Sequence, residues 1–350
     1  MAVPDLLHEL LTAPGPSGYE TAPAAAWREA AEDFAEVSAD LVGSSVARVA
    51  GTQDGPRLAI VGHIDEIGLI VTHVDDNGFL WFAGVGGWDS QILIGQRVEV
   101  ATREGAVPGV VGKKPIHLLK DEERKKVPEL KELHIDIGAK DGDEARGMVR
   151  IGDVAVIAGE PVEMPNRRLV SRSLDNRLGA YVALEAARVA AGDGGPPGDV
   201  CAVAAAQEEI TFAGARTTAY ALEPDVALVV DVTFADAPGL DPKERGSHEF
   251  GSGPVLNRGA IVNPRVFELL HETAEAEEIP CTIEASARAT GTDADAVHLS
   301  RGGVPTGVVS IPLRYMHSPV EMVQLDDVDA CARLIAAFAR RLSPGTSFHR

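Results

Sequence analysis

Short apolar runs alternate with amphipathic segments along the second half of the chain, from residue 165 onwards. Runs of apolar and β-branched residues predict buried strands, whereas apolar residues spaced three and four positions apart predict helices. The predicted strands cover residues 200–206, 226–231 and 308–311, and the predicted helices cover residues 174–190, 214–222, 266–278 and 326–341. Strands that alternate with helices indicate a mostly parallel sheet that is covered on both faces.

The N-terminal part of the chain continues this α/β pattern. Two predicted helices, residues 5–11 and 21–34, are separated by a turn that is rich in proline and glycine at residues 14–18. The continuous apolar run at residues 57–64 is typical of a strand buried on both faces.

The pattern changes between Gly68 and Gly159, where short alternating segments are separated by glycine-rich turns. Such segments predict a small all-β module. Its predicted strands include residues 92–100, 106–111 and 154–157, and the dense charge run at residues 120–131 predicts an exposed loop or short helix. We therefore predict an α/β domain made of residues 1–67 and 164–350, with a β domain inserted at residues 68–163.

Length, charge and cysteine content restrict the class of protein. A chain of 350 residues is longer than one hydrophobic core usually organises, which agrees with two domains. The formal net charge of −21 argues against nucleic acid as a partner. No apolar run approaches the ~18 residues of a membrane span, and no secretory signal is visible. The three cysteines lie far apart, which indicates thiols in a reducing compartment, so we expect a cytoplasmic protein.

Acidic and histidine residues follow the predicted strands. In open parallel sheets, ligands bind beyond the carboxyl ends of the strands, so side chains at these ends converge on one edge. The residues placed there are His63 and Asp65 after the strand at 57–64, Asp175 at the start of a helix, Glu208 and Glu209 after the strand at 200–206, Asp231 at the end of a strand, and His317 after the strand at 308–311.

Each of these residues also has a plain structural explanation. A single histidine after a strand is more often a hydrogen-bonded structural residue, Asp175 is well placed to cap its helix, and Asp231 to cap a turn. Adjacent glutamates usually face solvent, but the apolar run before Glu208 and Glu209 directs at least one of them inward. A buried carboxylate without a partner is costly. Taken together, the placement favours a metal site.

The charge sum favours two ions. Asp175, Glu209 and Asp231 supply three negative charges, and a bridging hydroxide supplies a fourth, which balances two divalent cations. Carboxylates and imidazoles without thiolates suit zinc, cobalt or manganese. Paired metals are a common arrangement in hydrolases, where they hold both the attacking and the leaving group.

Several motifs resemble those of the tetrahedral aminopeptidases, the glutamyl-aminopeptidase-type family of dinuclear metallopeptidases, some of whose members carry an endoglucanase label. The matching segments are GHIDEIG at 62–68, SLDNR at 173–177, QEE at 207–209, DVT at 231–233, GTDA at 291–294 and RYMHSP at 314–319. They cover nearly the whole chain in order. The segments 210–214 and 233–236 depart from the family pattern without removing a ligand.

This resemblance implies roles for the matching residues. His63 and Asp231 would bind one metal, Glu209 and His317 the other, and Asp175 would bridge them. Glu208 would be the general base, and Asp65 would hold a ligand in place. Thr292 and Asp293 are weaker candidates for substrate binding. The family fold also implies that the inserted β domain, of barrel or PDZ-like form, is a dimerisation domain and that dimers assemble into a tetrahedral dodecamer.

The expected reaction is removal of N-terminal residues from short peptides by a metal-bridging hydroxide, with Glu208 as general acid and base. Two alternatives stay open. One is a different hydrolase on the same site, either an N-acyl amino-acid deacylase or the glucanase of the family label, although glycosidases normally use two carboxylates without a metal pair. The other is a non-catalytic assembly protein. The preferred N-terminal residue, the native metal and the choice between dimer and dodecamer also stay open.

Overall fold

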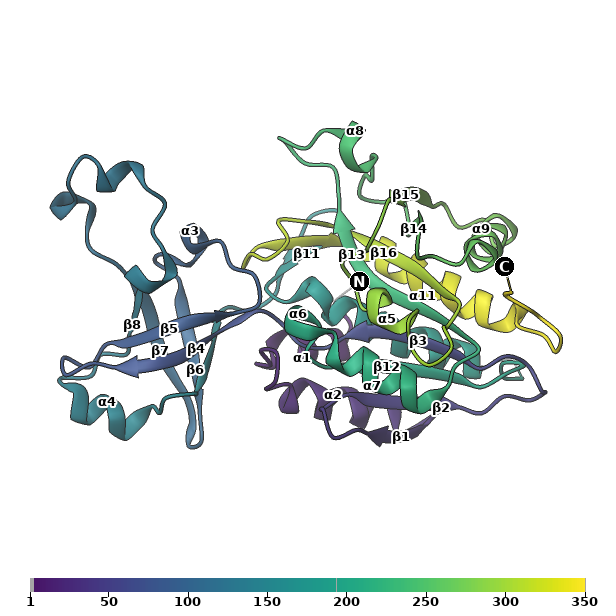
Figure 1. The fold of residues 1–350 in the computed structure, drawn as a ribbon, viewed down its shortest axis with the longest axis horizontal. Helices are drawn as coiled ribbons and strands as arrows, with labels where there is room; N and C mark the ends of the chain where they lie inside the picture. Colours follow the sequence, from purple (N-terminus) through teal and green to yellow (C-terminus); the bar gives the residue numbers. More distant parts are fainter. Residues whose placement is uncertain (1–2, 193, 350) are drawn as a thin grey trace.

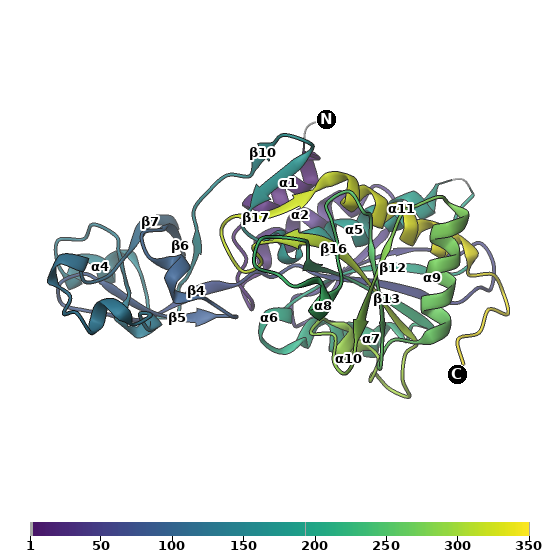
Figure 2. The same ribbon diagram turned by 90° about the horizontal axis from the view of Figure 1, so that it is seen from above.

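The computed structural model describes residues 3–192 and 194–349 and places them in two units. A large α/β body contains an 11-stranded sheet, and a closed β-barrel extends from one side of it (Figure 1). Seen from above, the barrel stands clear of the helices that cover the large sheet (Figure 2). The predicted α/β architecture with a separate small β unit is therefore confirmed.

The large sheet is parallel at its centre and antiparallel at its edges. Its main path, in spatial order, is β1 (Glu36–Ala39), β2 (Ser45–Val49), β12 (Val200–Ala205), β3 (Leu58–His63), β13 (Val226–Phe234), β16 (Thr306–Arg314), β17 (Glu321–Gln324), β11 (Arg168–Ser171) and β10 (Val162–Met164). β12, β3, β13 and β16 pair in parallel, and all six residues of β3 and of β12 are buried. Their carboxyl ends share one edge of the sheet.

Helices cover both faces of these central strands. α5 (Leu174–Ala191) packs against β3, β12 and β13, and α11 (Leu325–Arg341), α1 (Asp5–Thr12) and α2 (Thr21–Ala31) complete that layer. The opposite face carries α7 (Ala213–Leu222) and α10 (Ala294–Val297), while α9 (Pro264–Ala276) contacts α11 and β14 (Val255–Gly259). β14 pairs with β15 (Thr282–Ser286) beside β16. None of the helices in the described residues has the length and hydrophobicity needed to cross a bilayer.

The barrel has a core of its own. Its strands, in order around the barrel, are β4 (Gly68–Val74), β5 (Leu80–Val85), β8 (His134–Asp136), β7 (Gly105–Gly112), β6 (Arg97–Thr102) and β9 (Val154–Ile157). Inward-facing side chains such as Leu69, Val98 and Ile135 form a second buried cluster separate from that of the large sheet. α4 (Gly142–Met148) contacts β4, and residues 113–132 form a largely exposed arm with three short 3₁₀ turns.

Several predicted boundaries are wrong. The strand predicted at 92–100 begins only at Arg97, because Ser90–Leu93 forms the short helix α3, whose first turn donates a backbone hydrogen bond to the Asp89 side chain. The helix predicted at 21–34 ends at Ala31. β13 and β16 each continue three residues beyond their predicted ends, because the two strands pair with each other through Phe234.

Two glycines allow β3 and α5 to approach each other closely just before His63. A Cβ atom built on Gly62 would lie 2.1 Å from the carbonyl carbon of Gly179, a distance that real Cβ atoms do not adopt. The contact sets the height of α5, and therefore of Asp175 at its start, above the end of β3.

We expect Gly62→Ala to destabilise the protein by about 3 kcal/mol or more, because the added methyl group forces the backbones of β3 and α5 apart. Thermal unfolding monitored by circular dichroism would measure the loss. Gly147→Ala in α4 is the matched control, because nothing lies within 4 Å of its Cβ position and alanine favours helix. An unchanged unfolding temperature for Gly62→Ala would contradict this account.

Candidate functional site

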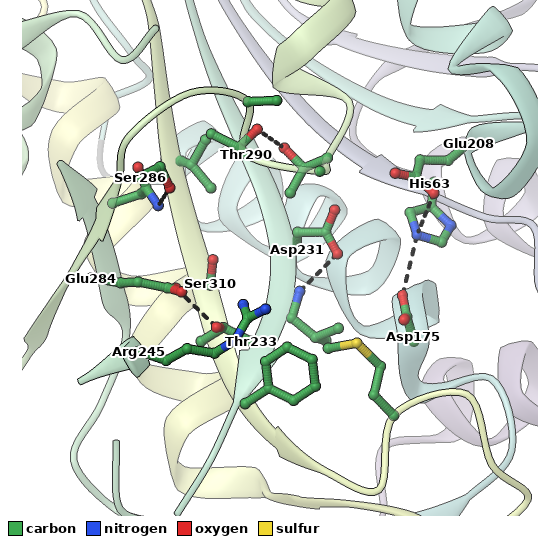
Figure 3. Close-up of a pocket in the computed structure, with 18 of the residues that line it drawn as sticks. His63, Asp175, Glu208, Asp231, Thr233, Arg245, Glu284, Ser286, Thr290 and Ser310 are labelled. Carbon is green, nitrogen blue, oxygen red and sulfur yellow. Dashed lines mark hydrogen bonds and ion pairs between the residues drawn. The ribbon is translucent and has the colours of Figure 1, made fainter. Parts of the chain in front are cut away.

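A cavity of about 550 Å³ opens where the central parallel strands end. Figure 3 shows His63, Asp175 and Glu208 on one side of it and Glu284 and Ser286 on the other. The structure brings all six of the predicted ligands and base to its lining: His63, Asp175, Glu208, Glu209, Asp231 and His317. Asp65 and Asp293 are buried behind the lining instead.

The Asp175 carboxylate lies between two imidazoles. Its Oδ1 is 3.3 Å from Nε2 of His63, and its Oδ2 is 3.3 Å from Nε2 of His317. Glu209 Oε1 approaches His317 Nε2 at 3.4 Å, and Glu208 Oε2 approaches His63 Nε2 at 3.6 Å. One carboxylate therefore faces two separate histidine-centred clusters.

Both imidazoles are oriented by an acceptor on their other nitrogen. His63 Nδ1 lies 3.3 Å from the carbonyl oxygen of Asp65, and His317 Nδ1 lies 3.0 Å from the carbonyl oxygen of Gly87. Such a contact fixes the ring and leaves Nε2 as the nitrogen that points into the cavity. Gly87 belongs to the loop that follows the barrel strand β5. A loop of the barrel therefore also orients a residue of this site.

Asp65 holds the start of the short helix α6 (Glu208–Thr211), which carries the two glutamates. Its Oδ1 accepts the backbone N–H of Glu208 at 3.0 Å, and its Oδ2 accepts that of Glu209 at 3.1 Å. The Ser17 hydroxyl donates a further hydrogen bond to the same carboxylate. Asp65 is fully buried, and Gln207, which precedes the pair, adopts a left-handed φ of 60°. The sharp turn after β12 therefore depends on this carboxylate.

The capping explanations for Asp175 and Asp231 are wrong. Ser173 occupies the N-cap of α5, and the Asp175 carboxylate is directed to the two imidazoles. Asp231 lies inside β13, three residues before its end, where its side chain accepts a hydrogen bond from Val232 N at 2.8 Å. The extension of β13 past the predicted end accounts for the difference.

The site carries more buried carboxylates than imidazoles. Burial raises the pKa of Glu208 to about 10 and also raises the pKa of Glu209 and of Asp231. The adjacent carboxylates of Asp175 and Glu209 raise the pKa of His317 to about 11. Glu209 Oε1 is buried and has no hydrogen-bond partner among the described residues. This excess of buried negative charge suits cations.

Two groups of side chains have the geometry to hold a metal ion. Each offers one imidazole nitrogen and two carboxylate oxygens that all lie within 4.8 Å of one another, and the groups are His63, Asp175 and Glu209, and His63, Glu208 and Asp231. The donor set has nitrogen and oxygen but no sulfur, which fits zinc, cobalt or manganese. Both groups share His63 and differ in this from the pairing that the family resemblance implies.

The weaker candidates Thr292 and Asp293 are separated by the structure. Thr292 lines the cavity, and its hydroxyl contacts Thr290 Oγ1 at 2.9 Å and accepts the N–H of Ala294 at the start of α10. Asp293 is 1% exposed, does not line the cavity, and neither carboxylate oxygen has a hydrogen-bond partner among the described residues.

Two features of the site were not predicted from the sequence. The first is the cavity wall formed by β14 and β15, where Glu284 accepts a hydrogen bond from the Thr233 hydroxyl at 2.8 Å. The alternation of Thr282, Glu284 and Ser286 is the signal that would have identified it. The second is Glu321, which contacts the backbone of both Asp175 and His317. Its only signal is an acidic residue next to a short apolar strand.

Comparisons with known proteins agree with this geometry. The family model of the M42 glutamyl aminopeptidases matches residues 43–334. The lysyl aminopeptidase of Pyrococcus furiosus is 36% identical over 348 residues, which are 97% of each chain.

Two solved structures share the fold over nearly their full length. A TET aminopeptidase from a marine sediment archaeon, Thaumarchaeota archaeon, has a TM-score of 0.93 at 38% identity and covers 97% of this chain and 96% of its own. The TET1 peptidase of Pyrococcus horikoshii, which can assemble into a tetrahedron or a large octahedral shell, has a TM-score of 0.85 at 30% identity, with 97% and 99% covered. These matches confirm the resemblance seen in the motifs. The chain belongs to the M42 glutamyl aminopeptidase family and is a peptide-bond hydrolase with aminopeptidase activity.

Proposed function

We propose that the protein is a dinuclear-metal aminopeptidase that releases N-terminal residues from short peptides, with Glu208 as general base and acid. The observation that carries the proposal is the Asp175 carboxylate, which directs one oxygen to His63 and the other to His317. A carboxylate in this position can serve two ions at once. The excess of buried negative charge around it gives independent support.

His63 and Asp231 would hold one ion, Glu209 and His317 the other, and Asp175 would bridge them. The ions would be zinc or cobalt, with manganese as the third possibility. When bound, a pair of divalent ions lowers the pKa of a shared water and polarises the scissile carbonyl. Asp65 does not line the cavity but positions Glu208 and Glu209, because its carboxylate accepts the backbone N–H of each.

Glu208 is placed to move the proton. It lies on the cavity lining with its Oε2 3.6 Å from His63 Nε2, and its own backbone is anchored by Asp65. It takes a proton from the attacking water and delivers it to the departing amine, which are the two roles of a general base and acid in amide hydrolysis. A glutamate whose backbone is fixed while its carboxyl group faces the cavity can serve both.

The substrate would enter the cavity from the side of β15. The wall there is polar, with Thr233, Glu284, Ser286 and Ser310, and the exposed Arg245 stacks over the Phe234 ring at 4.6 Å. Carboxylates near the metal ligands suit the free α-ammonium group of a peptide, which limits cleavage to the terminal residue. Of the two proposed substrate contacts, Thr292 lines this cavity and Asp293 lies behind it.

We further propose that the subunits form a homo-oligomer, with dimers assembled into a tetrahedral dodecamer. Under this proposal, residues 1–67 and 164–350 form the catalytic domain, and residues 68–163 form a dimerisation domain. The arm of the barrel exposes Ile116, Leu118 and Val127, each more than half exposed, and apolar residues gathered on one segment suit a subunit contact. The TET1 peptidase of Pyrococcus horikoshii can assemble into a tetrahedron or a large octahedral shell, which supports this proposal.

Replacing the general base should remove turnover and leave the metals in place. We expect Glu208→Gln to lower kcat by at least about 100-fold on aminoacyl p-nitroanilides, because the amide cannot accept the proton. Metal content, measured by plasma mass spectrometry, should stay at the wild-type value. Glu272→Gln on the exposed face of α9 is the matched control. Activity within a few-fold of wild type would exclude this role for Glu208, and a preference for N-acylated substrates would favour the deacylase.

Removal of the bridging carboxylate should cost both ions. We expect Asp175→Ala to bind fewer than one divalent ion per subunit where wild type binds two, because both clusters lose an oxygen ligand. Chelation of wild type should likewise abolish peptide hydrolysis, and added zinc or cobalt should restore it. Asp54→Ala, in an exposed loop before β3, is the control. Two ions retained in Asp175→Ala would contradict the bridge.

The proposed assembly predicts a particle with about twelve times the 36.8 kDa mass of one chain. Size-exclusion chromatography with light scattering measures this mass directly. We expect Leu118→Asp to lower it, because the charge would be buried in a subunit contact, whereas Leu41→Asp, at an exposed position outside the barrel, should not. A wild-type mass of one chain would rule the assembly out.

A further inference from the structure

Glu321 is a buried carboxylate that contacts the backbone of two residues of the site. It lies on β17 and is 2% exposed. Its Oε2 accepts the backbone N–H of Asp175 at 3.0 Å, and its Oε1 accepts that of His317 at 2.8 Å. No lysine, arginine or histidine side chain of the described residues forms an ion pair with it. Its two oxygens therefore serve backbone groups of the site only.

The two backbone segments held by Glu321 are irregular. Asp175 lies in the first turn of α5 but has a non-helical ψ of 104°. His317 has a left-handed φ of 58°, a backbone conformation that residues other than glycine rarely adopt. The left-handed conformation of His317 persists only where the surrounding structure enforces it. Hydrogen bonds to a carboxylate are stronger than those to neutral acceptors, so Glu321 is well suited to this task.

A carboxylate is the one side-chain group that suits this position. It offers two acceptor oxygens, whereas the amide of glutamine offers one oxygen and one N–H₂ donor. Glutamine at position 321 would therefore leave the N–H of either Asp175 or His317 facing another donor. Glutamine fails this requirement for two acceptors although it has the same size as glutamate.

We propose that Glu321 is a positioning residue for the metal site, which fixes Asp175 and His317 in the orientation needed to bind both ions. This inference rests on the proposed dinuclear function. Asp65 provides an internal parallel, because its two oxygens accept the N–H groups of Glu208 and Glu209 in the same manner. Two buried carboxylates thus hold the backbone of four residues of the site.

The test compares Glu321→Gln with Asp327→Asn. Asp327 is a matched control because it is 1% exposed and its two oxygens accept the N–H groups of Gly251 and Gly253 at 2.9 and 2.8 Å. Each variant is stripped of metal and titrated with cobalt by calorimetry and visible absorption. We expect Glu321→Gln to bind cobalt about 10–100-fold more weakly than wild type and with an altered spectrum. Asp327→Asn should match wild type in both, even if its unfolding temperature falls.

Glu321→Asp completes the series, because it keeps both acceptors on a shorter side chain. Its cobalt affinity should lie between those of wild type and Glu321→Gln, and it replaces the latter in the comparison if the glutamine variant does not fold. If Glu321→Gln binds cobalt as tightly as Asp327→Asn does, the role of Glu321 is overturned and the proposed dinuclear function is unaffected. If wild type itself binds no cobalt, the proposed dinuclear function fails, and the role of Glu321 fails with it.

Discussion

The Asp65 carboxylate is the interaction on which the rest of the site depends. It is fully buried at the end of β3 and binds the backbone of Glu208 and Glu209, which follow β12. β3 and β12 are neighbours in parallel register, with His63 opposite Ala205, so the two strand ends meet at one edge of the sheet. A buried carboxylate left without these donors would be costly, so the first turn of α6, which carries both glutamates, is fixed to the sheet. The two glutamates at this edge are therefore fixed to the parallel core of the sheet.

Charge and geometry impose opposite demands on this site. Like charges that share a buried site raise one another's pKa values and oppose folding, yet Asp175, Glu208, Glu209 and Asp231 all face one cavity. The fold tolerates them because buried carboxylates hold the backbones of Asp175, Glu208 and Glu209, and because the two imidazoles lie between the side chains. Such an arrangement is stable to the extent that cations complete it. The same excess of charge that makes the bare site costly would favour the binding of divalent cations.

Long apolar runs made the centre of the fold and most of the site predictable. All residues of β3 and β12 are buried, so their strand character is local, and the acidic residues that follow them had to meet at one edge. Short edge strands lack that signal. Glu321 was missed because its role depends on contacts 146 residues apart in the chain, which arise only when β17 pairs with β11 and β16. The helix α3 was mistaken for a strand because four residues are too few to show a period.

The inserted barrel is coupled to the site through its connections to the large sheet. The chain leaves the sheet directly after Glu66, which pairs with Arg172 and with the fully buried Arg177, so the point of exit is anchored to the segment that leads into α5. On the barrel side, Trp88 donates a hydrogen bond to Gly68, and Gly87 accepts the contact from His317. A shift of the barrel against the sheet would therefore change the orientation of one imidazole of the site. An assembly that restrains the barrel would restrain that imidazole as well, which joins oligomer formation to the geometry of catalysis.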